Sequence, residues 1–233
     1  IDLSKNNKFK KDTNSYRISI GKFGEIIKLI KEKRSKKVLF AGKIAKPNFS
    51  SIKLDFKGLY YMPSVIKAAK LGDAAIIKTI IKILSKEGIR VISSIFFNPE
   101  LSLIKGNYSK IKPTKKDIIS IKKGKANFNK LNNLDHIQAL VVKDGKIFAK
   151  EGKDGTKKML SKLKKNSNGI LMKLPKIKQD LRIDLPTIGL QTIKDIKKCG
   201  LKGVVLKSKK NIFLDKKKVI DFANKNKIFI NII

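Results

Sequence analysis

Residues 173–192 read KLPKIKQDLRIDLPTIGLQT, and this stretch decides how the rest of the chain is interpreted. Across 179–185, polar and apolar residues alternate, which predicts an extended strand with one charged face and one apolar face. The charged face would carry Asp180, Arg182 and Asp184. We therefore expect a strand that borders a core on one side and presents two acids around an arginine on the other.

The strand is expected to end at Asp184 or Leu185, because Pro186 has a fixed φ angle and cannot donate a hydrogen bond to a sheet. Ligands bind at the carboxyl ends of strands in open α/β sheets, so the end of this strand is a candidate site. Two carboxylates beside an arginine could bind Mg²⁺ through oxygen, hold a phosphate through Arg182, or supply a general base. The alternative is a surface strand with ordinary ion pairs.

A chain of 233 residues with 41% hydrophobic residues can bury one large core or two small ones. No run of about 18 uncharged apolar residues occurs, so we expect no membrane-spanning helix. The first residues also lack the apolar core of a signal peptide. A single cysteine, Cys199, allows no intramolecular disulfide and fits a reducing cytosol. With one cysteine and one histidine, the chain has no zinc-binding set.

The formal net charge of +38 raises the question of a polyanionic partner. Four of the 56 basic residues are arginine and the others are lysine, spread through every segment rather than gathered in one stripe. Lysine, isoleucine and asparagine have AT-rich codons, so base composition alone could produce this balance. A lysine-rich surface is also attracted to anionic lipid headgroups.

Residues 1–98 are expected to form an α/β domain. Helices are predicted at 21–33, 63–70 and 73–86, and strands at 37–42 and 88–94. The loop after the first strand contains Gly42, Lys43 and Lys46, whose backbone amides and ammonium groups could contact a phosphate. Residues 99–113 contain two prolines and a glycine and are interpreted as a linker.

Residues 114–233 are expected to form a second, mixed α/β domain. Asp144-Gly145 between two apolar runs is a strong signal for a β-hairpin. Strands are predicted at 169–174, 203–206 and 228–232, and helices at 190–198 and 215–226. This alternation is typical of a layered α/β sheet.

Glu151 and the residues that follow it form a second candidate site. Asp154 or Thr156 can cap a helix that begins here, and Gly155 before that helix could create an anion-binding site from free amides. The alternative is a plain capped helix.

The run from Gln179 to Gly189 resembles the signature of the LpxI-type UDP-2,3-diacylglucosamine diphosphatases of lipid A biosynthesis. Residues 40–47 resemble a Phe-Ala-Gly-x-x-x-Arg-Pro segment of that family, with Lys46 in place of the arginine. The segment that begins at Glu151 resembles the family's Glu-x-x-Glu-Gly-Thr-Asp, although Lys157 reverses the charge of the last residue. The resemblance extends over nearly the whole chain from about Gly21.

This resemblance implies a cytoplasmic, metal-dependent hydrolase that converts UDP-2,3-diacylglucosamine to UMP and 2,3-diacylglucosamine 1-phosphate between two domains. The divalent cation would be Mg²⁺, and the partners would be this lipid-linked sugar nucleotide and the cytoplasmic surface of the inner membrane, with a homodimer as a further candidate and no specific nucleic acid. The family also implies a strand and a glycine-rich turn before Ile1, so the N-terminal domain is expected to be a truncated Rossmann-like one.

The resemblance implies that Asp184 is a metal ligand or base. From their position and residue type, Asp180 and Glu151 are expected to be further metal-binding carboxylates. The other candidate residues are expected to bind substrate. They are Gly42, Lys43, Lys46, Gly155, Thr156, Lys173, Lys176, Gln179, Arg182 and Thr187.

Two alternatives belong to other classes. A polyanion- or nucleic-acid-binding protein would explain the charge, but only 7% of residues are aromatic and none form a cluster that could stack bases. A sugar-nucleotide-binding module without catalysis is the second alternative.

Overall fold

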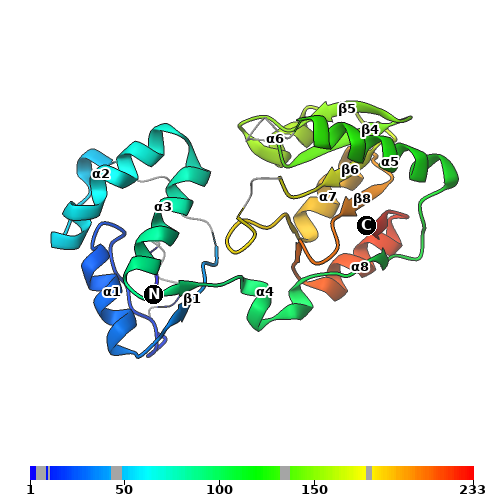
Figure 1. Ribbon diagram of the computed structural model, residues 1–233. Coiled ribbons are helices and arrows are strands. Elements are labelled where there is room, and N and C mark those ends of the chain that lie inside the picture. Colours follow the sequence, from blue (N-terminus) through cyan, green and yellow to red (C-terminus); the bar gives the residue numbers. More distant parts are fainter. Residues whose placement is uncertain (4–8, 10, 43–48, 132–136, 177–179) are drawn as a thin grey trace. The chain divides into compact units, whose positions relative to one another are not determined.

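The computed structural model describes residues 1–3, 9, 11–42, 49–131, 137–176 and 180–233 (Figure 1). The chain forms two compact units, Ile1–Ser94 and Ile95–Ile233. Both units combine helices with β-structure, so the predicted two-domain α/β fold is confirmed. None of the helices in the described part of the chain is long and apolar enough to span a membrane.

The N-terminal unit packs helices around two short parallel strands. Its elements are α1 (Phe23–Glu32), β1 (Lys37–Val38), η1 (Phe49–Ser51), α2 (Phe56–Lys70), α3 (Asp73–Lys86) and β2 (Arg90–Val91). Strands β1 and β2 pair in parallel, with Lys37 opposite Arg90. Helix α2 begins seven residues before the predicted start, because the Asp55 carboxylate caps it by accepting a hydrogen bond from Gly58 N at 2.7 Å.

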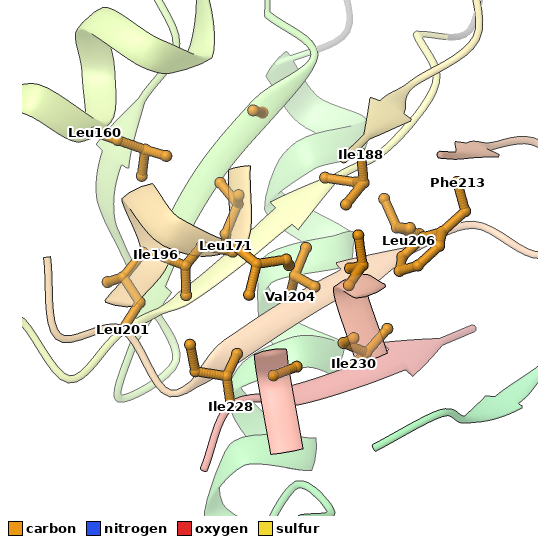
Figure 2. Close-up of a cluster of buried hydrophobic side chains, with 14 of the residues drawn as sticks. Leu160, Leu171, Ile188, Ile196, Leu201, Val204, Leu206, Phe213, Ile228 and Ile230 are labelled. Carbon is orange, nitrogen blue, oxygen red and sulfur yellow. The ribbon is translucent and has the colours of Figure 1, made fainter. Parts of the chain in front are cut away.

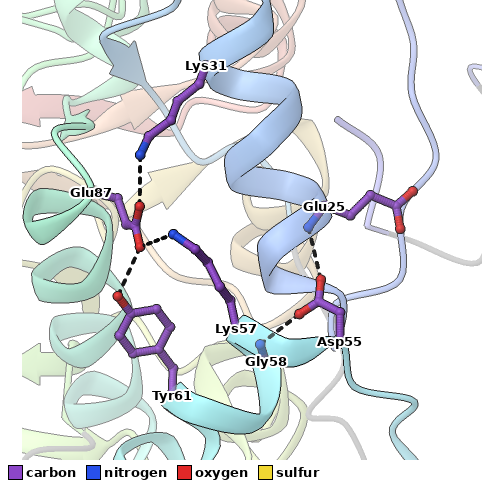
Figure 3. Close-up of polar contacts among 7 residues, drawn as sticks. All are labelled: Glu25, Lys31, Asp55, Lys57, Gly58, Tyr61 and Glu87. Carbon is purple, nitrogen blue, oxygen red and sulfur yellow. Dashed lines mark hydrogen bonds and ion pairs between the residues drawn. The ribbon is translucent and has the colours of Figure 1, made fainter.

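Charged side chains join the three helices of this unit (Figure 3). Glu87, at the end of α3, accepts hydrogen bonds from Lys31 of α1 at 2.9 Å and from Lys57 and Tyr61 of α2. These hydrogen bonds, first that from Lys31, lower the pKa of Glu87 to about 2. Asp55 also accepts from Glu25 N at 2.9 Å, so the start of α2 is attached to α1.

The C-terminal unit contains a six-stranded mixed sheet in the order β3-β10-β8-β6-β4-β5. The strands are β3 (Gly106–Asn107), β4 (Ala139–Lys143), β5 (Lys146–Lys150), β6 (Ile170–Lys173), β8 (Gly203–Leu206) and β10 (Phe229–Ile232). Strands β6, β8 and β10 are parallel, and the β4–β5 hairpin and the edge strand β3 run antiparallel to their neighbours. A separate parallel pair joins β7 (Thr187–Ile188) to β9 (Ile212–Phe213).

Helices cover both faces of this sheet. Helices α6 (Gly155–Ser161), α7 (Leu190–Lys198) and α8 (Lys216–Lys225) contribute to the cluster on one face, where Leu160 and Ile196 pack near Leu171 and Val204 (Figure 2). Helix α5 (Lys115–Lys130) packs Ile121 and Phe128 on the other face. The strands alternate between the two clusters, which is the pattern expected of a sheet buried on both faces.

Two sequence predictions differ from the structure. The prediction of a strand at 179–185 is wrong, because residues 181–183 form a turn. In this turn, Arg182 N donates to Asp180 Oδ1 at 3.0 Å, and Asp184 N donates to Asp180 O at 3.0 Å. Aspartate side chains commonly form hydrogen bonds to the nearby backbone, and such local bonds compete with the pairing of strands. The stretch 99–113 is not a plain linker, because it contains the 3₁₀ turn η2 (Pro99–Leu101) and supplies strand β3 to the sheet.

Candidate functional site

The candidate site lies in the C-terminal unit, at the carboxyl end of strand β6. Lys173 is the last residue of this strand, and its side chain lies on the face of Leu171 because side chains alternate along a strand. Lys173 Nζ donates a hydrogen bond to the carbonyl oxygen of Thr187 at 3.0 Å. Burial lowers the pKa of Lys173, and the negative charges of Glu151 and Asp184 act in the opposite direction.

Glu151, whose charge acts on this lysine, is held in place by hydrogen bonds. It follows strand β5 and is only 6% exposed. Its Oε1 accepts a hydrogen bond from Thr156 Oγ1 at 2.6 Å, and its Oε2 accepts one from Gln138 N at 2.7 Å. Both carboxylate oxygens are thus engaged, which fixes the negative charge near Lys173.

Gly155 and Thr156 begin helix α6 next to this carboxylate. Gly155 has a φ of +83°, a conformation that other residues rarely adopt, and a Cβ at this position would lie 4.0 Å from Glu151 Oε1. The backbone turn therefore brings the start of α6 to Glu151. The Thr156 hydroxyl is used to hold Glu151 instead of facing solvent.

Asp184 approaches the same lysine from the turn that follows Asp180. It is half-buried and lies two residues before buried Pro186. Its charge acts on Lys173, yet its carboxylate accepts no hydrogen bond from the described part of the chain. Of the acidic side chains beside Lys173, Asp184 is therefore the one available to a ligand, a water molecule or a metal ion.

Asp180 and Arg182 form a bidentate ion pair, with Arg182 Nε 2.9 Å from Asp180 Oδ1 and Nη2 2.6 Å from Oδ2. This hydrogen bonding raises the pKa of Arg182. Both Asp180 oxygens are occupied by this pair. The guanidinium remains half-exposed, and two of its nitrogens face Asp180.

The three carboxylates predicted as metal ligands do not form a preformed set. No group of three or more His, Cys, Asp or Glu side chains that could hold a metal ion occurs in the described ranges. Glu151 is engaged by Thr156 and Gln138, and Asp180 is engaged by Arg182. Asp184 is the remaining member.

The structure therefore brings together six of the predicted site residues. They are Glu151, Gly155, Thr156, Lys173, Asp184 and Thr187. Lys176 lies three residues beyond β6 and is half-buried. Gly42 belongs to the N-terminal unit and is exposed, and Lys43, Lys46 and Gln179 lie outside the described residues.

Sequence reasoning missed Gln138. Its backbone amide holds Glu151, and its carbonyl oxygen accepts from Leu174 N at 3.0 Å, so it connects the hairpin to the end of β6. Its side-chain Nε2 is buried and has no hydrogen-bond partner among the described residues. The signal in the sequence is a single amide side chain inside the apolar run 137–142.

Comparisons with known proteins agree with one another over both units. A family model described as the LpxI N-terminal domain matches residues 2–101, and one described as the LpxI C-terminal domain matches residues 104–231. The UDP-2,3-diacylglucosamine pyrophosphatase LpxI of Caulobacter vibrioides is 31% identical over 223 residues, which is 91% of this chain and 80% of that protein.

Proposed function

The chain belongs to the LpxI family, and on this premise we propose that it hydrolyses the pyrophosphate bond of UDP-2,3-diacylglucosamine, releasing UMP and 2,3-diacylglucosamine 1-phosphate. The relative in Caulobacter vibrioides carries the name of this activity. The observation that supports the proposal is the half-buried ammonium of Lys173, on which the charge of Asp184 acts, together with an Asp184 carboxylate that accepts no hydrogen bond from the described residues. A cation and a carboxylate whose charges act on each other suit an anionic substrate that must be attacked by water.

The reaction requires a water oxygen to form a bond to one phosphorus while the bond from that phosphorus to the bridging oxygen breaks. The two products leave as phosphate monoesters, and the two protons of the water pass to the product phosphates or to solvent. Lys173 would stabilise the negative charge that develops on the phosphate oxygens. Thr187 O and the fixed charge of Glu151 would keep its ammonium in place.

We propose Mg²⁺ as the cofactor. Mg²⁺ commonly binds through one or two carboxylates together with substrate phosphates and water, so it does not need a cage of three protein carboxylates. Asp184 fits this role because its oxygens are available, whereas those of Glu151 are hydrogen-bonded within the protein. When bound, Mg²⁺ would neutralise charge on the diphosphate.

The remaining candidate residues are proposed to bind the substrate. Arg182 and Lys176 would contact phosphate oxygens from the C-terminal unit, and Gly155 would offer its backbone amide. Lys43 and Lys46 stay proposed phosphate-binding residues of the N-terminal unit. Because the substrate carries two acyl chains, we further propose that the reaction takes place at the cytoplasmic surface of the inner membrane.

Replacing Asp184 tests this proposal. Asp184→Asn keeps the shape of the side chain and removes its charge, and we expect the rate of UMP release to fall about 100-fold or more. The matched control is Asp221→Asn, which removes a charge from an exposed position on α8 and should leave the rate unchanged. UMP release that persists in Asp184→Asn would show that the site is wrong, and a wild-type protein that binds the substrate without releasing UMP would favour a non-catalytic sugar-nucleotide-binding module.

A further inference from the structure

Helix α2 carries an apolar face that the described structure leaves uncovered. Phe56 is 94% exposed, Leu59 63% and Tyr60 76%. Residues at these spacings lie on one face of a helix, so the three side chains form a continuous patch. Leu71, directly after the helix, is 75% exposed. Contiguous exposed apolar surface of this kind marks an interaction site rather than chance exposure.

The rotation of α2 about its axis is fixed, so this face cannot turn inward. Gly58 is buried on the opposite side, and a Cβ at this position would lie 2.3 Å from the carbonyl oxygen of Gly21. Close backbone contact of this kind requires glycine at the contact point. Asp55 attaches the start of the helix to Glu25 N, and Lys57 pairs with Glu87 (Figure 3). The polar contacts and the glycine together leave the aromatic face outward.

The charges on α2 all have one sign. Its fifteen residues include three lysines and no acidic residue. Lys67 and Lys70 are exposed in its last turns, and Lys53 is exposed just before it. A helix with an apolar face that contains aromatic residues, flanked by lysines, has the composition of helices that lie in a lipid headgroup region.

We propose that helix α2 docks the protein on an anionic lipid bilayer, with Phe56, Leu59 and Tyr60 inserted at the boundary between headgroups and acyl chains. Lys67 and Lys70 would contact the anionic headgroups. A second copy of this face is disfavoured as the occupant, because it would oppose lysine to lysine. This docking rests on the proposed function, because the proposed substrate is held in a membrane by its two acyl chains.

Vesicle flotation tests the docking surface without using catalysis. The protein carries +38 formal charge, so vesicles of phosphatidylcholine with added phosphatidylglycerol will attract it non-specifically, and the assay must separate apolar insertion from this attraction. The test variant is Phe56→Ser/Leu59→Ser/Tyr60→Ser. The matched control is Ile118→Ser/Ile119→Ser, which removes exposed apolar surface from the lysine-rich helix α5.

We expect the triple variant to bind these vesicles about tenfold or more weakly than wild type, and the α5 control to bind within about twofold of wild type. At about 0.5 M salt, where screening suppresses headgroup attraction, wild type should still float and the triple variant should not. Equal binding by wild type and the triple variant would overturn the proposal. A change of the triple variant from dimer to monomer in sedimentation would overturn it as well, by assigning the face to a second copy.

A fluorescent label keeps the proposal testable if the triple variant fails to fold. Tyr60→Cys, labelled with an environment-sensitive fluorophore, should shift its emission to the blue when vesicles are added, and Ile119→Cys should not. The native Cys199 is 5% exposed and should remain unlabelled in the folded protein. An unshifted Tyr60→Cys emission contradicts insertion.

The docking proposal and the proposed function fail in different ways. The triple variant should release UMP at the wild-type rate from substrate dispersed in detergent and lose activity on substrate in vesicles. Asp184→Asn should lose activity on both forms of the substrate and still float. Flotation by the triple variant equal to that of a wild-type protein that releases UMP overturns docking alone, and flotation by a wild-type protein that releases no UMP overturns the hydrolase alone.

Discussion

Lys173 carries its ammonium group in a partly buried position, where the charged form is disfavoured by lost hydration. Its burial lowers its pKa, and the nearby Glu151 and Asp184 offset part of that cost. A lysine that remained on the surface would meet a phosphate as a hydrated ion, whereas a half-buried one meets it with less competing water. This placement is the residue-scale basis for assigning Lys173 to the phosphate oxygens.

The pH dependence of activity tests the role of Lys173. Only the protonated ammonium can stabilise phosphate charge, so activity should fall as pH rises through the Lys173 pKa. Because this pKa lies below the ordinary lysine value, the fall should begin at a lower pH than a surface lysine would give. Arginine stays protonated across this range, so in Lys173→Arg the alkaline fall should move upward or disappear.

The control for this pH profile is Lys210→Arg, which changes an exposed lysine and should leave the wild-type profile intact. The measurement is the rate of UMP release across the alkaline range. An identical alkaline limb in wild type and Lys173→Arg would assign the titration to another group.

The parts of the site that could be predicted are those whose residues lie close together in the sequence. Glu151, Gly155 and Thr156 lie within one short segment, so their proximity follows from a strand end that leads into a helix. Contact between Lys173 and Thr187 depends on the turn at Asp180, and the sequence pattern predicts a strand there instead. The pairing of Asp180 with Arg182 also depends on that turn.

At the scale of elements, Glu87 connects α1, α2 and α3 through Lys31, Lys57 and Tyr61 (Figure 3). Its carboxylate is charged in the folded unit at a pH where an unfolded glutamate is protonated. The interactions of the charged Glu87 carboxylate therefore stabilise the folded state above the unfolded pKa of glutamate. This contribution is lost as pH falls towards about 2.

Thermal unfolding across the acid range checks this contribution. Between pH 7 and pH 4.5 the Glu87 contribution should be nearly constant, and it should decline from there towards about 2. Glu87→Gln should cost about 1–2 kcal/mol at neutral pH, since Lys31 and Lys57 are half-exposed and solvent screens them, and should reduce the acid dependence. Glu32→Gln, which removes a looser and more exposed pair with Lys28, is the control. An acid profile that is the same in Glu87→Gln and wild type would contradict this role.

Some elements follow from local sequence signals and others do not. Asp144 and Gly145 have φ angles of 49° and 75°, as a two-residue hairpin turn requires, and the β4–β5 hairpin is confirmed. Strand β8 lies at the predicted residues 203–206. All four of its residues are buried, so the strand appears in the sequence as a short apolar run. The start of α2 was missed because Pro63 is a typical first-turn residue, whereas here it lies inside a helix that Asp55 caps.

At the scale of the whole molecule, each unit has its own core or charged network, and the family matches divide the chain close to the same place. The edge strand β3 comes from the stretch that the sequence predicts as a linker, so the sequence places the start of the C-terminal unit too late. The sequence contains no signal for strand β3, because a two-residue edge strand needs no apolar periodicity.

Phosphorus NMR of UDP-2,3-diacylglucosamine, dispersed in detergent with Mg²⁺ and the purified chain, follows the bond whose cleavage is proposed. We predict that the two diphosphate resonances disappear together and are replaced by two phosphate monoester resonances, those of UMP and the sugar 1-phosphate, and that both changes are absent with Asp184→Asn. Diphosphate resonances that stay constant with wild type, or that disappear at the same rate with Asp184→Asn, would contradict the assignment of this chemistry to Asp184 and Lys173.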